Sequence, residues 1–306
     1  MLGRMHASIG RRARRAASVI APGAVVLLLL GYVGATRGET AVEAVATVPA
    51  WAIAGAVMAH LLTLILRTEA WRTVLQGTGT EGLDPTAIHA ANAGAFLAGT
   101  VQGQAAMPAR IALLRRYGGK GAPEVSQIAL ADAPIVLLEV CTTALLAAVG
   151  STAVGLIPVW VPWAMLCAAV TVLVALRLLH ERLRHRRFAA GLGVLAKPDL
   201  RARLAIVVGA FTVMALVRTW IVLAGFGLPA DPAHVCLVLF TMGAVGLLPI
   251  GLGTGPAATV AALGTTNLAA ATGAGMVVST ATVLAVLIYA ASSWAWRARI
   301  PMPVPA

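Results

Sequence analysis

Long apolar runs separated by short polar segments occupy nearly the whole chain. A helix needs about 20 residues to cross a bilayer, and six uninterrupted runs are close to that length or exceed it. These predicted spans are residues 18–35, 49–66, 125–149, 157–179, 204–226 and 273–296. Two further apolar stretches, residues 86–109 and 233–270, are interrupted by polar residues or by Gly and Pro. The pattern predicts an all-α fold, a polytopic membrane helical bundle of six full spans plus two broken stretches.

The first run could also pass for the apolar part of a signal peptide. No small-residue cleavage site follows it convincingly, so we interpret it as a span. Together the runs leave no room for a second folded domain. We therefore expect one transmembrane domain over residues 18–298, with a basic N-terminal segment at 1–17 and a C-terminal tail at 299–306.

Composition and charge agree with a membrane protein. Of the 306 residues, 59% are hydrophobic and 11% charged, whereas an ordinary soluble domain has roughly 45–50% and 25%. This excludes a soluble globular enzyme. The net charge of +12 would also suit a nucleic-acid-binding protein. However, the Lys and Arg residues fall at the ends of the apolar runs and form no single patch, so we expect no nucleic-acid partner and interpret them as topology signals.

These basic residues predict the orientation of the chain. If the chain crosses as described, all of them except Arg37 and Arg218 lie on one face of the membrane, whereas Glu39, Glu43 and Asp231 lie on the other. Because basic residues concentrate in cytoplasmic loops, both termini are expected in the cytoplasm, and the protein in the cytoplasmic membrane.

The same asymmetry constrains the two broken stretches. Basic clusters flank residues 86–109 on both sides, so this stretch must enter and leave from the cytoplasm, whereas residues 233–270 must do so from outside. Each is a re-entrant hairpin or a pair of short spans. The two halves, residues 18–150 and 157–298, then have the same order and opposite orientation. This is the pattern of an inverted-topology repeat, in which substrate sites form near the midplane between broken helices.

The second broken stretch contains the segment LLPIGLGTGPAA, residues 247–258. Gly251, Gly253 and Gly255 permit tight backbone, Pro256 suits the first turn of a new helix, and Thr254 could cap that helix. The start of such a helix can bind a phosphate or another anion. A nucleotide-binding loop is disfavoured because no strand precedes the glycines and no acidic residue follows at the right distance.

The first broken stretch carries Gln102 and Gln104 and is followed by Arg110. The glutamines indicate a hydrated turn, or else they satisfy the turn's own backbone. Arg110 could bind a phosphate with its planar fork. It could equally be a cytoplasmic anchor that extends to the lipid headgroups.

Charges inside predicted spans point to a pathway or a partner, because burying a charge is costly. Asp132 and Glu139 are seven residues apart and share a helical face. Arg218 lies at a depth that would allow a salt bridge with Glu139. That pair would either hold the two halves together or line a groove for a zwitterionic or anionic headgroup. His60 and His234 have no metal-ligand companions and are interpreted as packing or interfacial residues.

The sequence contains few signs of catalytic chemistry. It contains no zinc-protease, serine-hydrolase, P-loop or paired-aspartate motif. Asp132 and Glu139 are too far apart along one helix to share a proton. We therefore expect no enzyme, cofactor or metal site, and a membrane-embedded transferase with one of these carboxylates as base is the least favoured alternative.

Three segments resemble the transmembrane region of the lysylphosphatidylglycerol synthase family, also called flippase-like, and they occur in that family's order. AMPARIALLRRYGG, residues 106–119, is similar to its G-D-x-x-R-x-x-L-L-R-R stretch. LRTEAWRTVL, residues 66–75, is similar to its Arg/Trp-rich end of the second span, and LLPIGLGTGP resembles its P-x-x-G-G-L-G-x-x-E segment. The chain departs from the family where acidic residues are replaced by Met107 and Pro256, and where Asp132 is followed by Ala133.

The resemblance implies the handling of polar lipids. In the bifunctional members of the family, this region moves an aminoacylated phospholipid across the bilayer, and a separate soluble domain makes that lipid. We therefore expect a translocator of a membrane phospholipid or a lipid-linked glycan. The alternative is a non-catalytic scaffold for a cell-envelope synthase or glycosyltransferase.

Overall fold

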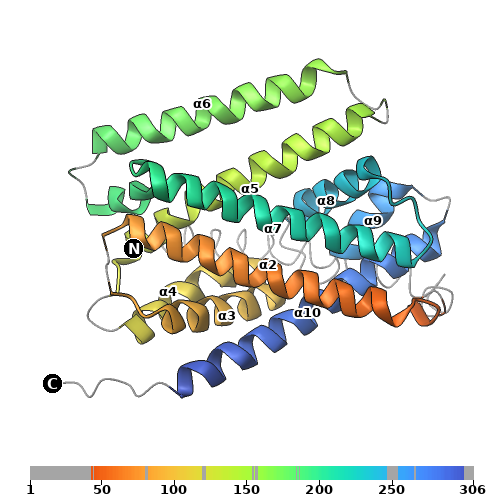
Figure 1. Cartoon of the computed structure of the whole chain (residues 1–306), viewed down its shortest axis with the longest axis horizontal. Helices are drawn as coiled ribbons and strands as arrows, with labels where there is room; N and C mark the ends of the chain where they lie inside the picture. Colours follow the sequence, from red (N-terminus) through yellow and green to blue (C-terminus); the bar gives the residue numbers. More distant parts are fainter. Residues whose placement is uncertain are drawn as a thin grey trace, which may run out of the picture.

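The computed structural model is a bundle of helices (Figure 1). It describes residues 43, 45–79, 82–118, 122–153, 155, 158–183, 185, 187–246, 254–264 and 267–299. The helices in this part of the chain are α2 (Ala50–Gly77), α3 (Pro85–Val101), η1 (Gly103–Ala105), α4 (Ala106–Gly118), α5 (Val125–Ala153), α6 (Trp160–Leu183), η3 (Arg187–Leu195), α7 (Pro198–Gly225), α8 (Pro232–Gly246), α9 (Thr254–Leu263) and α10 (Leu268–Ala298). No strand occurs among the described residues, so the predicted all-α class is confirmed for them.

Five of the helices are long and apolar enough to cross a membrane. They are Ala50–Gly77, Val125–Gly150, Trp163–Leu183, Pro198–Gly225 and Leu268–Ala298. Each corresponds to one of the predicted spans, and several extend beyond the apolar run because helix formation continues into the charged ends. The first predicted span, residues 18–35, lies outside the described residues.

Most of the basic residues that flank the described helices gather at one end of the bundle. α2, α4, α6 and α10 end there, and α3, α5 and α7 begin there. We call this the basic end; it carries the side chains of Arg72, Arg115, Arg116, Arg182, Lys197, Arg201, Arg203, Arg297 and Arg299. The clustering that the sequence predicted for these residues is therefore reproduced by the fold.

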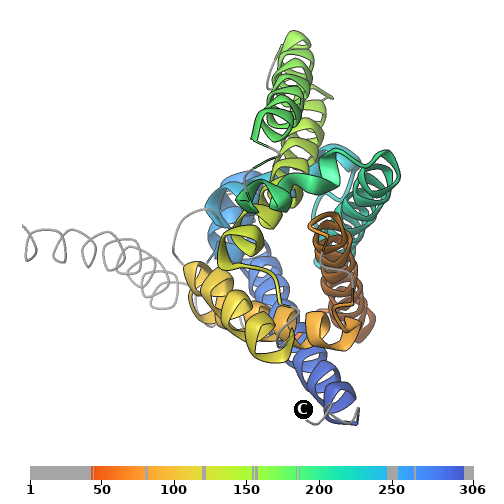
Figure 2. The ribbon, with the colours of Figure 1, turned by 90° about the vertical axis from the view of Figure 1, so that its left-hand side faces the viewer.

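α2 and α7 run antiparallel and pack side by side along their length (Figures 1 and 2). Small residues allow the close approach, since Gly225 leaves room for Ala52 and Gly55 lies against Ile221. The pair forms one wall of the bundle. α5 crosses behind it and continues as a helix through Pro134.

The first broken stretch forms a helical hairpin, which we call hairpin 1. It consists of α3, the turn at Gln102–Ala105 and α4, and its two arms pack against each other. The predicted stretch, 86–109, is too short, because the returning arm continues to Gly118. With 17 and 13 residues, the arms measure about 25 and 20 Å at 1.5 Å per residue. Neither arm is long enough to cross a hydrocarbon core of about 30 Å.

The second broken stretch contains a similar pair of short helices, α8 and α9, which also pack together. We call it hairpin 2. Its connecting residues, 247–253, lie outside the described part of the chain. The predicted stretch of 233–270 extends too far, because α10 already begins at Leu268 and not near residue 273. Hairpins 1 and 2 start at opposite ends of the bundle (Figure 1).

Both hairpins begin with the same local device. Asp84 precedes Pro85 and accepts a hydrogen bond from the Thr86 N–H at 2.9 Å. Asp231 precedes Pro232 and accepts from the His234 N–H at 3.2 Å. An aspartate as N-cap followed by proline in the first turn is a strong helix start, because the side chain pairs free N–H groups and proline has none to lose.

Polar contacts fix hairpin 1 against its neighbours. The Tyr289 hydroxyl on α10 lies 2.8 Å from Thr68 Oγ1 on α2 and 2.8 Å from His89 Nδ1 on α3. His89 Nε2 lies 3.5 Å from a carboxylate oxygen of Glu69. These contacts join three helices across the core, and buried networks of this kind are stable when every member has a partner.

η3 and α6 lie at one side of the bundle. η3 packs into the core through Leu192, Val194 and Leu195, where Gly77 and Gly193 bring their backbones together with no room for a side chain. α6 contacts α5 and η3 and otherwise stands away from the other helices (Figure 2). The most apolar stretch of α6 carries no buried residue among those described.

Candidate functional site

A cavity of about 630 Å³ lies between the two hairpins. Hairpin 1 contributes its turn and the facing sides of α3 and α4, hairpin 2 contributes α8 and the start of α9, and α2, α5, α7 and α10 complete the wall. We call this the central cavity. Its polar lining includes three arginines, Arg67, Arg110 and Arg218, and one carboxylate, Asp132.

Arg110 is held by three different contacts. Its Nε donates to Asn92 Oδ1 at 2.6 Å, its Nη1 lies 3.6 Å from Asp132 Oδ1, and its guanidinium lies over the Trp71 ring at 4.2 Å from the centroid. It is only 6% exposed. The alternative of a cytoplasmic anchor is therefore wrong. Because α4 is the returning arm of hairpin 1, Arg110 faces the interior about two turns before α4 ends at the basic end.

Glu139 pairs with Arg67. The Arg67 Nη2 donates to Glu139 Oε2 at 2.5 Å, and both side chains are about one third exposed. The predicted salt bridge between Glu139 and Arg218 is thus wrong. The position of a residue along its span predicts depth, but it cannot tell which of two arginines on neighbouring helices faces the carboxylate.

Arg218 has a different environment from the other two arginines. Its Nη1 donates to His60 Nδ1 at 2.6 Å and approaches Thr282 Oγ1 at 3.4 Å. Its Nε is buried and has no hydrogen-bond partner in the described part of the chain. Because a guanidinium can only donate, His60 Nδ1 must accept, so the imidazole is neutral with its proton on Nε2. Arg218 is 9% exposed.

The glutamines lie at the turn of hairpin 1. Both are exposed, and Gln104 lines the central cavity whereas Gln102 is not part of its lining. The backbone of the turn is paired with other backbone groups, since the Gln102 N–H donates to Ala98 O and its carbonyl accepts from the Ala105 N–H. The turn is therefore satisfied through its backbone.

Part of the site predicted in hairpin 2 lies outside the described residues. This applies to Gly251 and Gly253, and the side chain of Thr254 is also not described. The predicted new helix with Pro256 in its first turn is confirmed, but Thr254 is already the first residue of α9 and not the cap that precedes it. Gly255 lines the central cavity and packs against Gly275 and Ser279 of α10 without space for a side chain.

Several residues of the central cavity were missed by sequence reasoning. His60 was interpreted as a packing residue, Arg67 was counted only as a topology signal, and Ser279 was not considered. A signal for the first two exists in the sequence, because His60 and Arg67 are seven residues apart and share one helical face.

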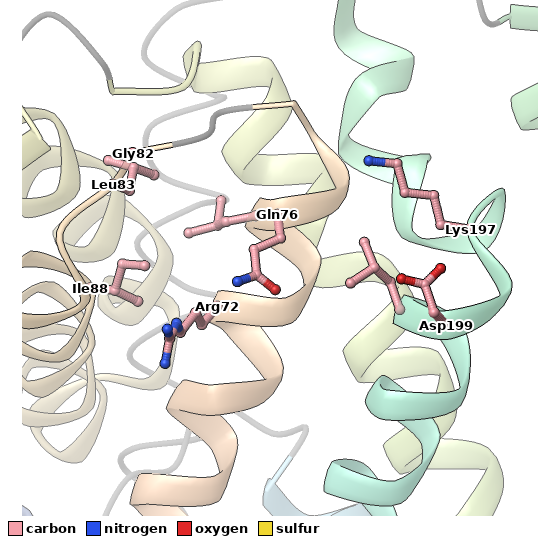
Figure 3. Close-up of a pocket in the computed structure, with 9 residues that line it drawn as sticks. Arg72, Gln76, Gly82, Leu83, Ile88, Lys197 and Asp199 are labelled. Carbon is pink, nitrogen blue, oxygen red and sulfur yellow. The ribbon is translucent and has the colours of Figure 1, made fainter.

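A second, smaller cavity of about 410 Å³ lies at the basic end between α2, α3 and α7. Arg72 and Gln76 line it from α2, and Lys197 and Asp199 lie on its far side at the start of α7 (Figure 3). None of the predicted site residues contributes to it. The candidate site is therefore the central cavity, where hairpin 1, Asp132 and Arg218 meet.

Known proteins add nothing further. Comparisons of the chain with family models, with curated proteins and with solved structures find no match.

Among the described residues, no group of three or more His, Cys, Asp or Glu side chains is arranged to hold a metal ion. Two of the three cavity arginines face a carboxylate, and the cavity lies between helices too apolar for a soluble protein. Guanidinium groups, hydroxyls and an amide in such a cavity can bind a polar, anionic or zwitterionic group inside the membrane.

Proposed function

We propose that this protein translocates a polar lipid or a lipid-linked glycan across the cytoplasmic membrane. The observation that carries the proposal is the central cavity, which is lined by both hairpins and by Arg67, Arg110 and Arg218. Its volume of about 630 Å³ lies within the range of roughly 300–1,000 Å³ that is usual for small-molecule sites. A headgroup would occupy this cavity while the acyl chains stay among the apolar outer faces of the helices.

We further propose that the two halves of the chain form an inverted-topology repeat. Such repeats place a substrate between broken helices and expose it to either side in turn, as translocation requires. We assign α2, α3, α4 and α5 to one half and α7, α8, α9 and α10 to the other. The shared Asp-Pro starts of α3 and α8 favour this assignment. So do Arg67-Thr68 and Arg218-Thr219, which lie at corresponding places on the antiparallel pair α2 and α7.

The distribution of charge supports an orientation with the basic end in the cytoplasm. Hairpin 1 would then enter from the cytoplasm and hairpin 2 from outside. In the proposed cycle, the headgroup enters from one side, is bound between the two hairpins, and leaves on the other side after the hairpins move.

Reconstitution in lipid vesicles tests the proposal. Purified protein is inserted into phosphatidylcholine vesicles that contain a trace of fluorescent phosphatidylglycerol, and the label accessible to an impermeant quencher is measured over time. We expect the inner-leaflet label to become accessible in vesicles with protein but not in empty vesicles. Gln104→Trp should slow this movement because an indole at the exposed turn of hairpin 1 fills the cavity mouth.

Arg177→Ala is the matched control. Arg177 is exposed on α6 and pairs with Glu181 of the same helix, far from the central cavity. This variant should move lipid like the wild type. If wild-type vesicles behave like empty ones with phosphatidylglycerol and with a fluorescent glycolipid, translocation by this chain is refuted, and co-purification of an envelope synthase would favour the scaffold alternative.

A further inference from the structure

Arg218 is the cavity arginine whose charge is not balanced. Arg67 has Glu139 and Arg110 has Asp132, whereas Arg218 has only a neutral imidazole and a hydroxyl among the described residues. Burying a cation without an anion is costly. A fold that keeps such a cation at the wall of a cavity favours a ligand that brings the missing negative charge.

The surroundings of Arg218 fit an oxyanion. Its buried Nε lacks a hydrogen-bond partner in the described part of the chain, so one of its donors is unsatisfied. Ser279 and Thr282 line the same cavity from α10, one turn apart. The Thr282 hydroxyl donates to the Val278 carbonyl oxygen and faces Arg218 Nη1, so it positions the guanidinium, whereas Ser279 is the candidate hydroxyl donor. The start of α9 reaches the cavity at Gly255, which lies directly against Ser279, and the positive end of a helix dipole favours an anion there.

We infer that Arg218, with Ser279 and Thr282 and the first turn of α9, forms a subsite for the phosphate group of a phospholipid or a lipid-linked sugar phosphate. This inference rests on the proposed function and names its substrate class. A planar guanidinium with free donors recognises phosphate through paired hydrogen bonds. By contrast, Arg110 donates from Nε to Asn92 and its charge faces the carboxylate of Asp132, so hairpin 1 would contact the uncharged or zwitterionic part of the headgroup.

Binding in detergent tests the subsite without requiring transport. The protein is held in a maltoside detergent, which carries no phosphate, and dihexanoyl phosphatidylglycerol is titrated while thermal unfolding is followed. We expect the lipid to stabilise the wild type, and Arg218→Gln to weaken its binding about tenfold or more, the loss expected for charge-assisted hydrogen bonds. Arg218→Lys should bind with intermediate strength because it keeps the charge but lacks the fork.

Controls separate the inference from a general loss of structure. Arg177→Gln should bind the lipid like the wild type. Inorganic phosphate is titrated in parallel, so stabilisation by phosphate alone would identify a free-anion site, whereas stabilisation by the lipid alone identifies a lipid phosphate. If Arg218→Gln does not fold, the affinities of the wild type and Arg218→Lys for dihexanoyl phosphatidylglycerol are compared instead. Equal affinities would then contradict the phosphate subsite.

Translocation provides the second readout. In vesicles, Arg218→Gln should lose movement of fluorescent phosphatidylglycerol while it retains movement of a fluorescent glucosyl diacylglycerol, which has no phosphate. Equal effects on both lipids, or equal binding of phosphatidylglycerol by wild type and Arg218→Gln, would overturn the phosphate subsite. Movement of neither lipid by the wild type refutes the transport proposal but leaves the binding result valid.

Discussion

The three cavity arginines illustrate how differently one residue type behaves in one protein. Arg110 is stacked on Trp71 and held by Asn92 and Asp132. Arg67 has one strong carboxylate contact, and Arg218 has no acidic partner among the described residues. Since the net contribution of a buried ion to stability depends on its partners, the same substitution should change the stability of the protein by different amounts at two of these sites.

We expect Arg110→Met to destabilise the folded protein by about 1–3 kcal/mol, because Asn92 and Asp132 lose their donor. Arg218→Met should change stability by less than about 1 kcal/mol or increase it, because an unbalanced charge is replaced by an apolar side chain of similar length. Thermal unfolding of both variants in the same detergent, without added lipid, measures the difference. An equal loss for both variants would mean that Arg218 is a structural residue.

At the scale of helices, small residues decide how closely elements approach. α9 and α10 meet at Gly255 and Gly275, and a Cβ on Gly255 would come within 2.5 Å of the Gly275 carbonyl oxygen. Since membrane helices associate mainly through close packing, such contacts fix the position of a hairpin. Gly255, which the sequence indicated as a position of tight backbone, therefore also allows the close packing of α9 on α10.

Gly255→Ala should destabilise the protein by about 1–3 kcal/mol, the usual cost of an overfilled contact. Gly209→Ala is the matched control, because Gly209 lies within α7 with nothing within 4 Å of the position of a Cβ. That variant should be neutral, or more stable by roughly 0.5–1 kcal/mol, because alanine favours the helix. Thermal unfolding distinguishes the two, and equal stability would argue against close α9–α10 packing.

At the scale of the whole molecule, the proposal depends on a central cavity that contains water. Gln104 lies at the exposed turn of hairpin 1 and lines the central cavity. Val172 lies on the exposed, apolar face of α6, which contacts few other helices. Both positions are exposed in the isolated protein, but in a membrane the first should meet water and the second lipid.

Cysteine labelling in intact membranes tests this distinction. In a background without Cys141, Cys167 and Cys236, we expect a water-soluble maleimide to label Gln104→Cys but not Val172→Cys. Arg299→Cys, at the basic end, should react only from the cytoplasmic side. A Gln104→Cys that stays unlabelled from both sides would show a dry cavity, and labelling of Arg299→Cys from outside would reverse the proposed orientation.

The helical class, the five described long spans and the two interrupted segments could all be predicted from the sequence. Each of these follows from local properties, because apolar length sets a span and Gly, Pro or polar residues interrupt it. The sequence also indicated Arg110, Gln104, Asp132 and Arg218 as site residues, and the fold brings these four to one cavity. Polar side chains within apolar runs are few, so these candidates can be identified without a structure.

The contacts between these residues, by contrast, depend on the tertiary structure. It placed Glu139 beside Arg67, put His60 against Arg218, and turned Arg110 toward Trp71. Hydrophobic patterning records depth in the membrane, whereas the rotation of each helix and the identity of its neighbours come from close packing between segments far apart in the chain. For that reason the pairing of charges, and with it the unbalanced Arg218, emerged from the fold.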